Sequence, residues 1–115
     1  MNERLKKIAA RFYATPSGRR PVREWILDLS GEDRRLVGRD IQKVEFGWPL
    51  GMPYCRPLGQ GLWEVRSDLA GGRIARVIFF IMEWDIVLLH AFEKKTQKTP
   101  KQQLDIALKR KREVQ

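Results

Sequence analysis

Residues 62–92 read LWEVRSDLAGGRIARVIFFIMEWDIVLLHAF. Residues 62–67, 73–82 and 86–92 of this stretch are rich in β-branched and aromatic residues and follow a period of two. This pattern is typical of β-strands. The connections between them, five and three residues long, fall within the usual lengths of hairpin loops. The stretch therefore predicts three consecutive antiparallel strands.

Two amphipathic helices are predicted before these strands. Pro21 suits the first position of a helix, because its missing N–H would have no helical partner there. Ser30, with Asp33 three residues later, is typical of the cap of a second helix. Apolar residues follow at helical spacing: Val22, Trp25, Ile26 and Leu29 in the first helix, and Leu36, Val37, Ile41 and Val44 in the second.

The remaining segments complete the predicted fold. Residues 7–15 resemble a strand that stops at a Pro-Ser-Gly turn, and Thr99-Pro100 begins a last helix. Residues 47–61 hold three prolines and four glycines, so neither a helix nor a ladder is expected to persist there. The expected order is β-α-α-β-β-β-α in one domain, residues 1–115. This is an α/β protein of the α+β type: a small, mainly antiparallel sheet with two N-terminal helices on one face and a C-terminal helix.

The composition limits the kinds of molecule that this protein is expected to bind. The chain has 115 residues, with 23 Lys and Arg against 14 Asp and Glu, and a formal charge of +9. Residues 1–23 carry +6 and residues 93–115 carry +5, so the excess lies at the two ends. Basic ends favour a phosphate-rich partner or an acidic protein surface. A solvated surface that keeps a small protein in solution would look the same.

Several classes of function are not expected. One cysteine and one histidine cannot supply a zinc site, and neither the Walker pattern nor G-x-G-x-x-G occurs. No metal or cofactor is therefore predicted. The longest apolar run, 77–82, is far shorter than the roughly 18 residues that span a bilayer. With no secretory signal in the sequence, we expect a cytoplasmic protein that does not bind membranes.

Alternation along the three strands sorts their side chains onto two faces. The first face is almost wholly apolar and is expected to be covered by the two helices: Trp63, Val65, Arg73, Ala75, Val77, Phe79, Ile81, Val87, Leu89 and Ala91. The second is expected to stay open and mixes apolar with polar residues: Leu62, Glu64, Arg66, Ile74, Arg76, Ile78, Phe80, Met82, Ile86, Leu88, His90 and Phe92.

The polar residues of the second face have structural as well as functional interpretations. In the expected register Glu64 lies opposite Arg76, and a cross-strand ion pair would explain both without any function. Arg66 lies opposite Ile74 and is expected to be the freer cation. His90 is more typical of a satisfied core residue than of an acid or base, although its ordinary pKa suits proton transfer.

A lysine-rich segment, 93–100, follows the last strand and adds cations to this face. Such a surface suits phosphate chemistry without a metal. RNA can be cut in this way, because its own 2′-OH serves as the nucleophile and the protein positions the backbone and stabilises the charged transition state.

Four segments resemble the RelE/HigB-type toxins of bacterial type II toxin–antitoxin systems, in the phage-derived branch of that superfamily. They are LWEVR at 62–66, RV at 76–77, IVLLHAF at 86–92 and KKTQKTP at 94–100. The similarity extends over roughly residues 8–112 in order and spacing. Its most specific part is the pattern Phe-x-Lys-Lys-x-x-Lys-Thr-Pro.

This resemblance implies a RelE-like fold, a helix-turn-helix antitoxin as partner and ribosome-dependent cleavage of mRNA. Operator DNA would be contacted only through the antitoxin. The candidate catalytic residues are then Arg66, Arg76, Lys94 and Lys95, and the candidate RNA-binding residues are Lys98, His90 and Lys101. Toxins of the wider superfamily often place a Tyr or His near the C-terminus, whereas residues 104–115 contain neither.

Two other functions remain open at this point. The related ParE toxins share the fold but poison DNA gyrase, and a fold does not determine a function. A non-catalytic protein that binds RNA or an antitoxin through its basic ends would also fit the charge distribution.

Overall fold

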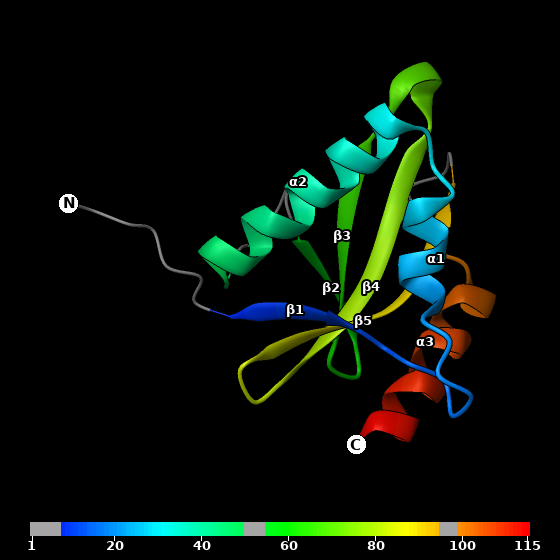
Figure 1. Ribbon diagram of the computed structural model, residues 1–115. Coiled ribbons are helices and arrows are strands. Elements are labelled where there is room, and N and C mark those ends of the chain that lie inside the picture. The colour runs from blue at the N-terminus through cyan, green and yellow to red at the C-terminus, as the bar shows by residue number, and fades with distance from the viewer. Residues whose placement is uncertain (1–7, 50–54, 95–98) are drawn as a thin grey trace.

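The computed structural model describes residues 8–49, 55–94 and 99–115, and shows a five-stranded mixed sheet with helices on both faces (Figure 1). The strands are β1 (Ala9–Phe12), β2 (Cys55–Gly59), β3 (Leu62–Asp68), β4 (Ile74–Met82) and β5 (Asp85–Glu93). The helices are α1 (Pro21–Leu27), α2 (Gly31–Gly47) and α3 (Lys101–Val114), with a 3-10 turn, η1, at Ala70–Gly72. The strand order across the sheet is β1-β5-β4-β3-β2.

The three predicted central strands are confirmed, with a different register between β3 and β4. Arg66 lies opposite Arg76, and not opposite Ile74 as expected. The chain reverses one residue later than predicted, because the backbone N–H of Leu69 donates to the carbonyl of Arg73, at 2.9 Å, and closes a loop over 69–73. The displacement along β4 is two residues. An even displacement keeps every side chain on its predicted face.

The β4–β5 connection is shorter than expected. Met82 pairs with Asp85, so the turn contains only Glu83 and Trp84 rather than residues 83–85. Glu83 has a φ of 56°, the left-handed conformation that a tight hairpin turn requires. Because the turn is one residue shorter than predicted, β5 begins one residue earlier. The first side chains of β5 therefore point to the faces opposite those predicted.

A bulge corrects this exchange halfway along β5. Ile78 pairs with His90, whereas the next residue, Phe79, pairs with Leu88. Leu89 is therefore the extra, unpaired residue of a β-bulge. The predicted faces are therefore wrong for residues 86–89 and right for 90–92. Ile86 and Leu88 pack on the α1–α2 side, and Val87 and Leu89 on the other side.

The prediction of no ladder within residues 47–61 is wrong, because Cys55–Gly59 forms the antiparallel edge strand β2. An edge strand needs hydrogen-bond partners on one side only, so it tolerates Pro57, which has no N–H. The pairing with β3 becomes irregular between Pro57 and Gly59. The place of this segment at the edge of the sheet thus allows a strand to form from a composition that is unfavourable for strands.

The first strand is confirmed over a shorter range and lies at the opposite edge. β1 pairs with β5 in the parallel direction, which makes the sheet mixed. The backbone N–H of Ala10 donates to a carboxylate oxygen of Glu45, at 2.7 Å, so α2 protects part of this edge. Glu45 is 7% exposed despite its charge.

The two N-terminal helices cover one face of the sheet, as predicted, and α3 covers the other (Figure 1). Val22, Val37, Ile41 and Val44 from α1 and α2 belong to the first core. Ala107 of α3 belongs to the second core, and Leu104 and Leu108 pack against it. The expectation that the second face stays open is therefore wrong. The apolar residues on that face need a cover, and the apolar seam of α3 supplies it.

Replacing Ser30 by Ala is expected to lower the free energy of unfolding by about 1 kcal/mol, because its hydroxyl accepts from the backbone N–H of Asp33 at 3.2 Å and caps α2. Urea unfolding measures the change. Ser30→Asp, which can still accept that bond, is the matched control and should retain most of the stability. An equal loss in both variants would contradict a capping role.

Candidate functional site

Side chains from β2, β3, β4 and the segment before α3 converge around one buried carboxylate. We call this set, Arg56, Glu64, Arg66, Arg76 and Thr99, the arginine cluster. Glu64 is fully buried, and its Oε1 accepts from Nη1 of Arg76 at 2.9 Å and from Nη2 of Arg56 at 3.3 Å. Its Oε2 accepts from the hydroxyl of Thr99 at 2.5 Å. Both oxygens of the carboxylate are thus engaged.

Arg76 lies at the centre of the cluster with no exposed surface. Burial lowers the pKa of its guanidinium below the usual value, and the nearby Arg66 and Arg56 act in the same direction, while Glu64 opposes them. The predicted ion pair between Glu64 and Arg76 is confirmed, although the two residues are diagonal neighbours rather than directly opposite. The sequence-predicted candidate Arg76 is therefore a buried ion-pair residue.

Arg66 and Lys94 lie on the same face as Arg76. Arg66 is the direct cross-strand neighbour of Arg76 and is partly exposed. The backbone N–H of Lys94 donates to the carbonyl of Ile74 at 2.9 Å, which extends the β4–β5 pairing past the end of β5. Because positions two apart along a strand share a face, Lys94 joins the face that holds Arg76.

The other predicted lysines fall into two groups. Lys95 and Lys98 lie outside the described residues. Lys101 begins α3 with a highly exposed side chain, whose Nζ forms an ion pair with Asp105 at 2.8 Å. Lys101 is thus available to solvent and partly neutralised.

His90 has both ring nitrogens in contact with α3. Its Nε2 hydrogen-bonds with the side-chain oxygen of Gln103, and its Nδ1 lies 3.3 Å from Nη1 of Arg110. A guanidinium can only donate, so Nδ1 accepts and the proton is assigned to Nε2. Burial lowers the pKa of His90, and Arg110 lowers it further, while Gln103 opposes them. These contacts fit a neutral, satisfied core residue.

The single histidine gives a specific pH prediction. Because the pKa of His90 is lower in the folded chain, the unfolded chain binds a proton more readily below about pH 6.5. The contribution of His90 to stability is therefore complete above about pH 6.5 and decreases as the pH falls through the folded pKa. An NMR titration should place the ring midpoint below about 6.5, and His90→Gln should remove this part of the pH dependence of unfolding. A midpoint at or above that value would contradict the assignment.

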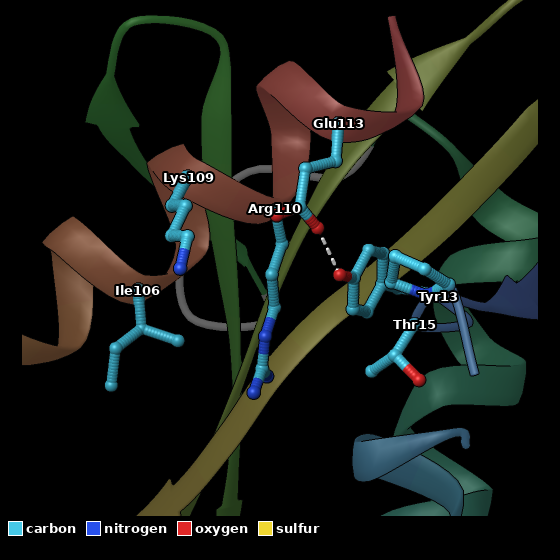
Figure 2. Close-up of a pocket in the computed structure, with 7 residues that line it drawn as sticks. Tyr13, Thr15, Ile106, Lys109, Arg110 and Glu113 are labelled. Atoms are coloured by element: carbon cyan, nitrogen blue, oxygen red, sulfur yellow. Dashed lines mark hydrogen bonds between the residues drawn. The ribbon is translucent and has the colours of Figure 1, made fainter. Parts of the chain in front are cut away.

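A second candidate surface lies where the β1–α1 connection meets α3. A pocket of about 390 Å³ is lined by Tyr13, Thr15, Pro16, Ile106, Lys109, Arg110 and Glu113. Figure 2 shows the Tyr13 hydroxyl pointing to the Glu113 carboxylate, to which it donates a hydrogen bond. This bond and burial raise the pKa of Tyr13. The guanidinium of Arg110 lies 5.4 Å from the centre of the Tyr13 ring. A tyrosine from the N-terminal region thus contacts the C-terminal helix.

Further cations follow this pocket along the chain. A second hollow, of about 330 Å³, begins at the residue after Pro16 and is lined by Ser17, Gly18, Arg19, Arg20, Arg23 and Glu24. The structure therefore brings the basic N-terminal and C-terminal segments together. We call this region, Arg19, Arg20, Arg23, Lys109 and Arg110, the basic end.

Neither a metal-binding group nor a membrane-spanning helix occurs within residues 8–49, 55–94 and 99–115. No group of three or more His, Cys, Asp or Glu residues within these ranges is placed to hold a metal ion. Over the same ranges, every helix is too short or too polar to cross a bilayer.

The sequence alone did not point to Arg56 or Thr99. Arg56 falls in a segment that was expected to be a loop, and Thr99 was expected only to begin a helix. The clue available in the sequence was the Thr-Pro pair that closes the lysine-rich segment. Its partner, Glu64, is 35 residues away, and no local pattern indicates a contact over that separation.

Comparison with known proteins identifies a family for most of this chain. No curated protein matched the sequence. Residues 24–112 match the family described as Phage derived protein Gp49-like (DUF891), a family associated with toxin–antitoxin systems. The match includes α2, the four strands from β2 to β5 and nearly all of α3, and so contains the whole arginine cluster. The chain therefore belongs to the phage-derived Gp49-like family.

Proposed function

We propose that this protein is the toxin of a type II toxin–antitoxin system, of the RelE/HigB type, and that it cleaves mRNA on the ribosome without a metal ion. The family membership supports a toxin role in general. The finer assignment rests on the resemblance of the strand and lysine-rich segments and on the chemistry of the arginine cluster.

The observation that carries the proposal is the juxtaposition of Arg66 and Arg76 on one face, with Lys94 on the same face. Adjacent cations of this kind favour a phosphate group, and their attraction increases as the phosphate gains charge in the transition state. The nucleophile would be the 2′-OH of the RNA itself: its oxygen bonds to phosphorus to give a 2′,3′-cyclic phosphate, the bond to the 5′-oxygen breaks, and the proton passes through solvent from the 2′-oxygen to the leaving 5′-oxygen. Fixed guanidinium groups need little reorganisation during the reaction, which is the main source of electrostatic catalysis.

In this proposal the candidate residues have different roles. Arg66 and Lys94, which are partly exposed, contact the scissile phosphate. The buried Arg76 does not contact the phosphate, but its positive charge increases the electrostatic attraction at this position. Lys95 remains a proposed catalytic residue, and Lys98, His90 and Lys101 remain proposed RNA contacts.

The proposed protein partner is a helix-turn-helix antitoxin, which would connect the complex to operator DNA. The basic end supports such a partner, because its five cations would complement an acidic segment of another protein. Binding of this kind steers association and is weakened by salt.

The deciding experiment adds the purified protein to translating ribosomes and maps the ends of the mRNA. New 5′ ends that require both ribosomes and protein are expected, together with growth arrest when the gene is induced. Intact mRNA at a high dose of folded protein would refute nuclease activity. A parallel supercoiling assay tests gyrase, and inhibition there with intact mRNA would instead support a ParE-like poison.

A further inference from the structure

We propose that Arg56 is an RNA-phosphate-binding residue of the arginine cluster and that Thr99 is the positioning residue that orients it. The inference rests on the function proposed above and adds two residues to its site. It follows from the exposure of the cluster's arginines and from the hydrogen bonds of a single hydroxyl group.

Exposure distinguishes Arg56 from Arg76. The side chain of Arg76 is 0% exposed, whereas that of Arg56 is 28% exposed. The Arg56 side chain therefore has surface that a ligand can reach from solvent, whereas the Arg76 side chain has none. Arg56 lies on β2, an edge strand, and pairs across the ladder with Glu64. This register places its guanidinium beside the buried carboxylate.

The distances indicate that Arg56 is the less important of the two in neutralising Glu64. Arg76 donates to Glu64 at 2.9 Å, and both side chains are fully buried. Arg56 reaches the same oxygen at 3.3 Å. A cation that serves only to neutralise Glu64 is expected to lie closer to the carboxylate and to be more deeply buried. Arg76, and not Arg56, has both properties.

Thr99 connects the carboxylate of Glu64 and the guanidinium of Arg56 through its single hydroxyl oxygen. Its hydroxyl donates to Oε2 of Glu64 at 2.5 Å, and the same oxygen accepts from Nη2 of Arg56 at 3.1 Å. Thr99 is 6% exposed, so little water competes for these bonds. Because the single hydroxyl proton goes to Glu64, the oxygen lone pairs face Arg56. The hydroxyl thereby orients the guanidinium before any ligand binds, which reduces the entropic cost of binding.

The test measures binding of a short fluorescein-labelled oligouridine over a range of salt concentrations. Loss of one phosphate contact lowers the slope of log affinity against log salt by about one unit. We expect this decrease for Arg56→Ala, whereas Arg56→Lys should retain the slope with weaker binding. Arg39→Ala is the matched control, because Arg39 is a half-exposed arginine of α2 that pairs with Asp40. It should keep the wild-type slope.

Thr99 variants test the positioning role separately. Thr99→Val keeps the shape and removes the hydroxyl, and we expect oligouridine binding to weaken by about 2- to 10-fold. Thr99→Ser should restore it. Val37→Ala, a core change on the opposite face, is the control for lost stability alone, and it should leave the affinity unchanged at temperatures where it is folded.

Each outcome is decisive. An Arg56→Ala slope equal to that of Arg39→Ala would overturn the assignment of Arg56, and equal affinities for Thr99→Val and wild type would overturn that of Thr99. Binding by the wild type without mRNA cleavage on ribosomes would refute the nuclease proposal and leave these assignments standing. No salt-dependent binding by the wild type would overturn both.

Discussion

Replacing Glu64 by Ala is expected to lower the free energy of unfolding by about 3–5 kcal/mol, because it leaves the guanidinium of Arg76 buried without its carboxylate partner. Both side chains are 0% exposed, so water cannot replace the lost contact in the folded state. Two further donors, Arg56 and Thr99, lose the same acceptor. Urea unfolding near neutral pH measures the change.

Glu24→Ala is the control for removal of an ordinary ion pair. Glu24 pairs with Arg19 at the surface, and such exposed pairs contribute about 1 kcal/mol or less. A double replacement, Glu64→Leu with Arg76→Met, should be less destabilising than Glu64→Ala, because the fully buried guanidinium of Arg76 is removed together with its carboxylate partner. A loss below about 1 kcal/mol in Glu64→Ala would show that Arg76 finds another partner or water.

Replacing Arg66 by Ala is expected to lower the rate of ribosome-dependent mRNA cleavage by about 100- to 1000-fold, if the proposed function holds. This is the usual effect of removing one preorganised donor that stabilises transition-state charge. Arg66 is partly exposed and adjacent to Arg76, so it can contact a phosphate directly. Single-turnover cleavage, with the variant in excess over ribosomes, separates this effect from weaker binding.

Two controls accompany the Arg66 measurement. Arg39→Ala should cleave at the wild-type rate, because Arg39 lies on α2, which covers the opposite face of the sheet from the cluster, and is paired with Asp40. Arg66→Lys should recover part of the rate, because it retains the charge but loses the planar fork of donors. Wild-type cleavage by a folded Arg66→Ala protein would exclude Arg66 from the catalytic site.

Much of the fold follows from local patterns in the sequence. The start of α1 at Pro21 and the cap of α2 at Ser30 were both predictable, because each depends on residues a few positions apart. The central strands were predictable from their period of two. The faces on which side chains lie were harder to predict. The β4–β5 turn is one residue shorter than predicted, which placed residues 86–89 on the wrong faces, and the bulge at Leu89 restored the predicted faces for residues 90–92.

The candidate site was only partly predictable. Arg66 and Arg76 could be placed on one face from alternation alone, and the register change of two residues preserved that placement. Lys94 was predicted only to follow the last strand, and the structure extends the pairing to it. Arg56 could not be included, because Pro57 and the surrounding glycines do not indicate a strand. Its ladder with β3 forms at a sheet edge where those residues are tolerated.

The sequence by itself determined where the three helices and the strands β1, β3, β4 and β5 lie, because these features depend on neighbours within a turn or two; the edge strand β2 and the faces of residues 86–89 were decided by the sheet. Only the tertiary structure decided that α3 covers the second face, and that Arg56, Glu64 and Thr99 share hydrogen bonds across separations of 8, 35 and 43 residues. Contacts over such separations depend on the packing of whole elements, and burial strengthens them by excluding water.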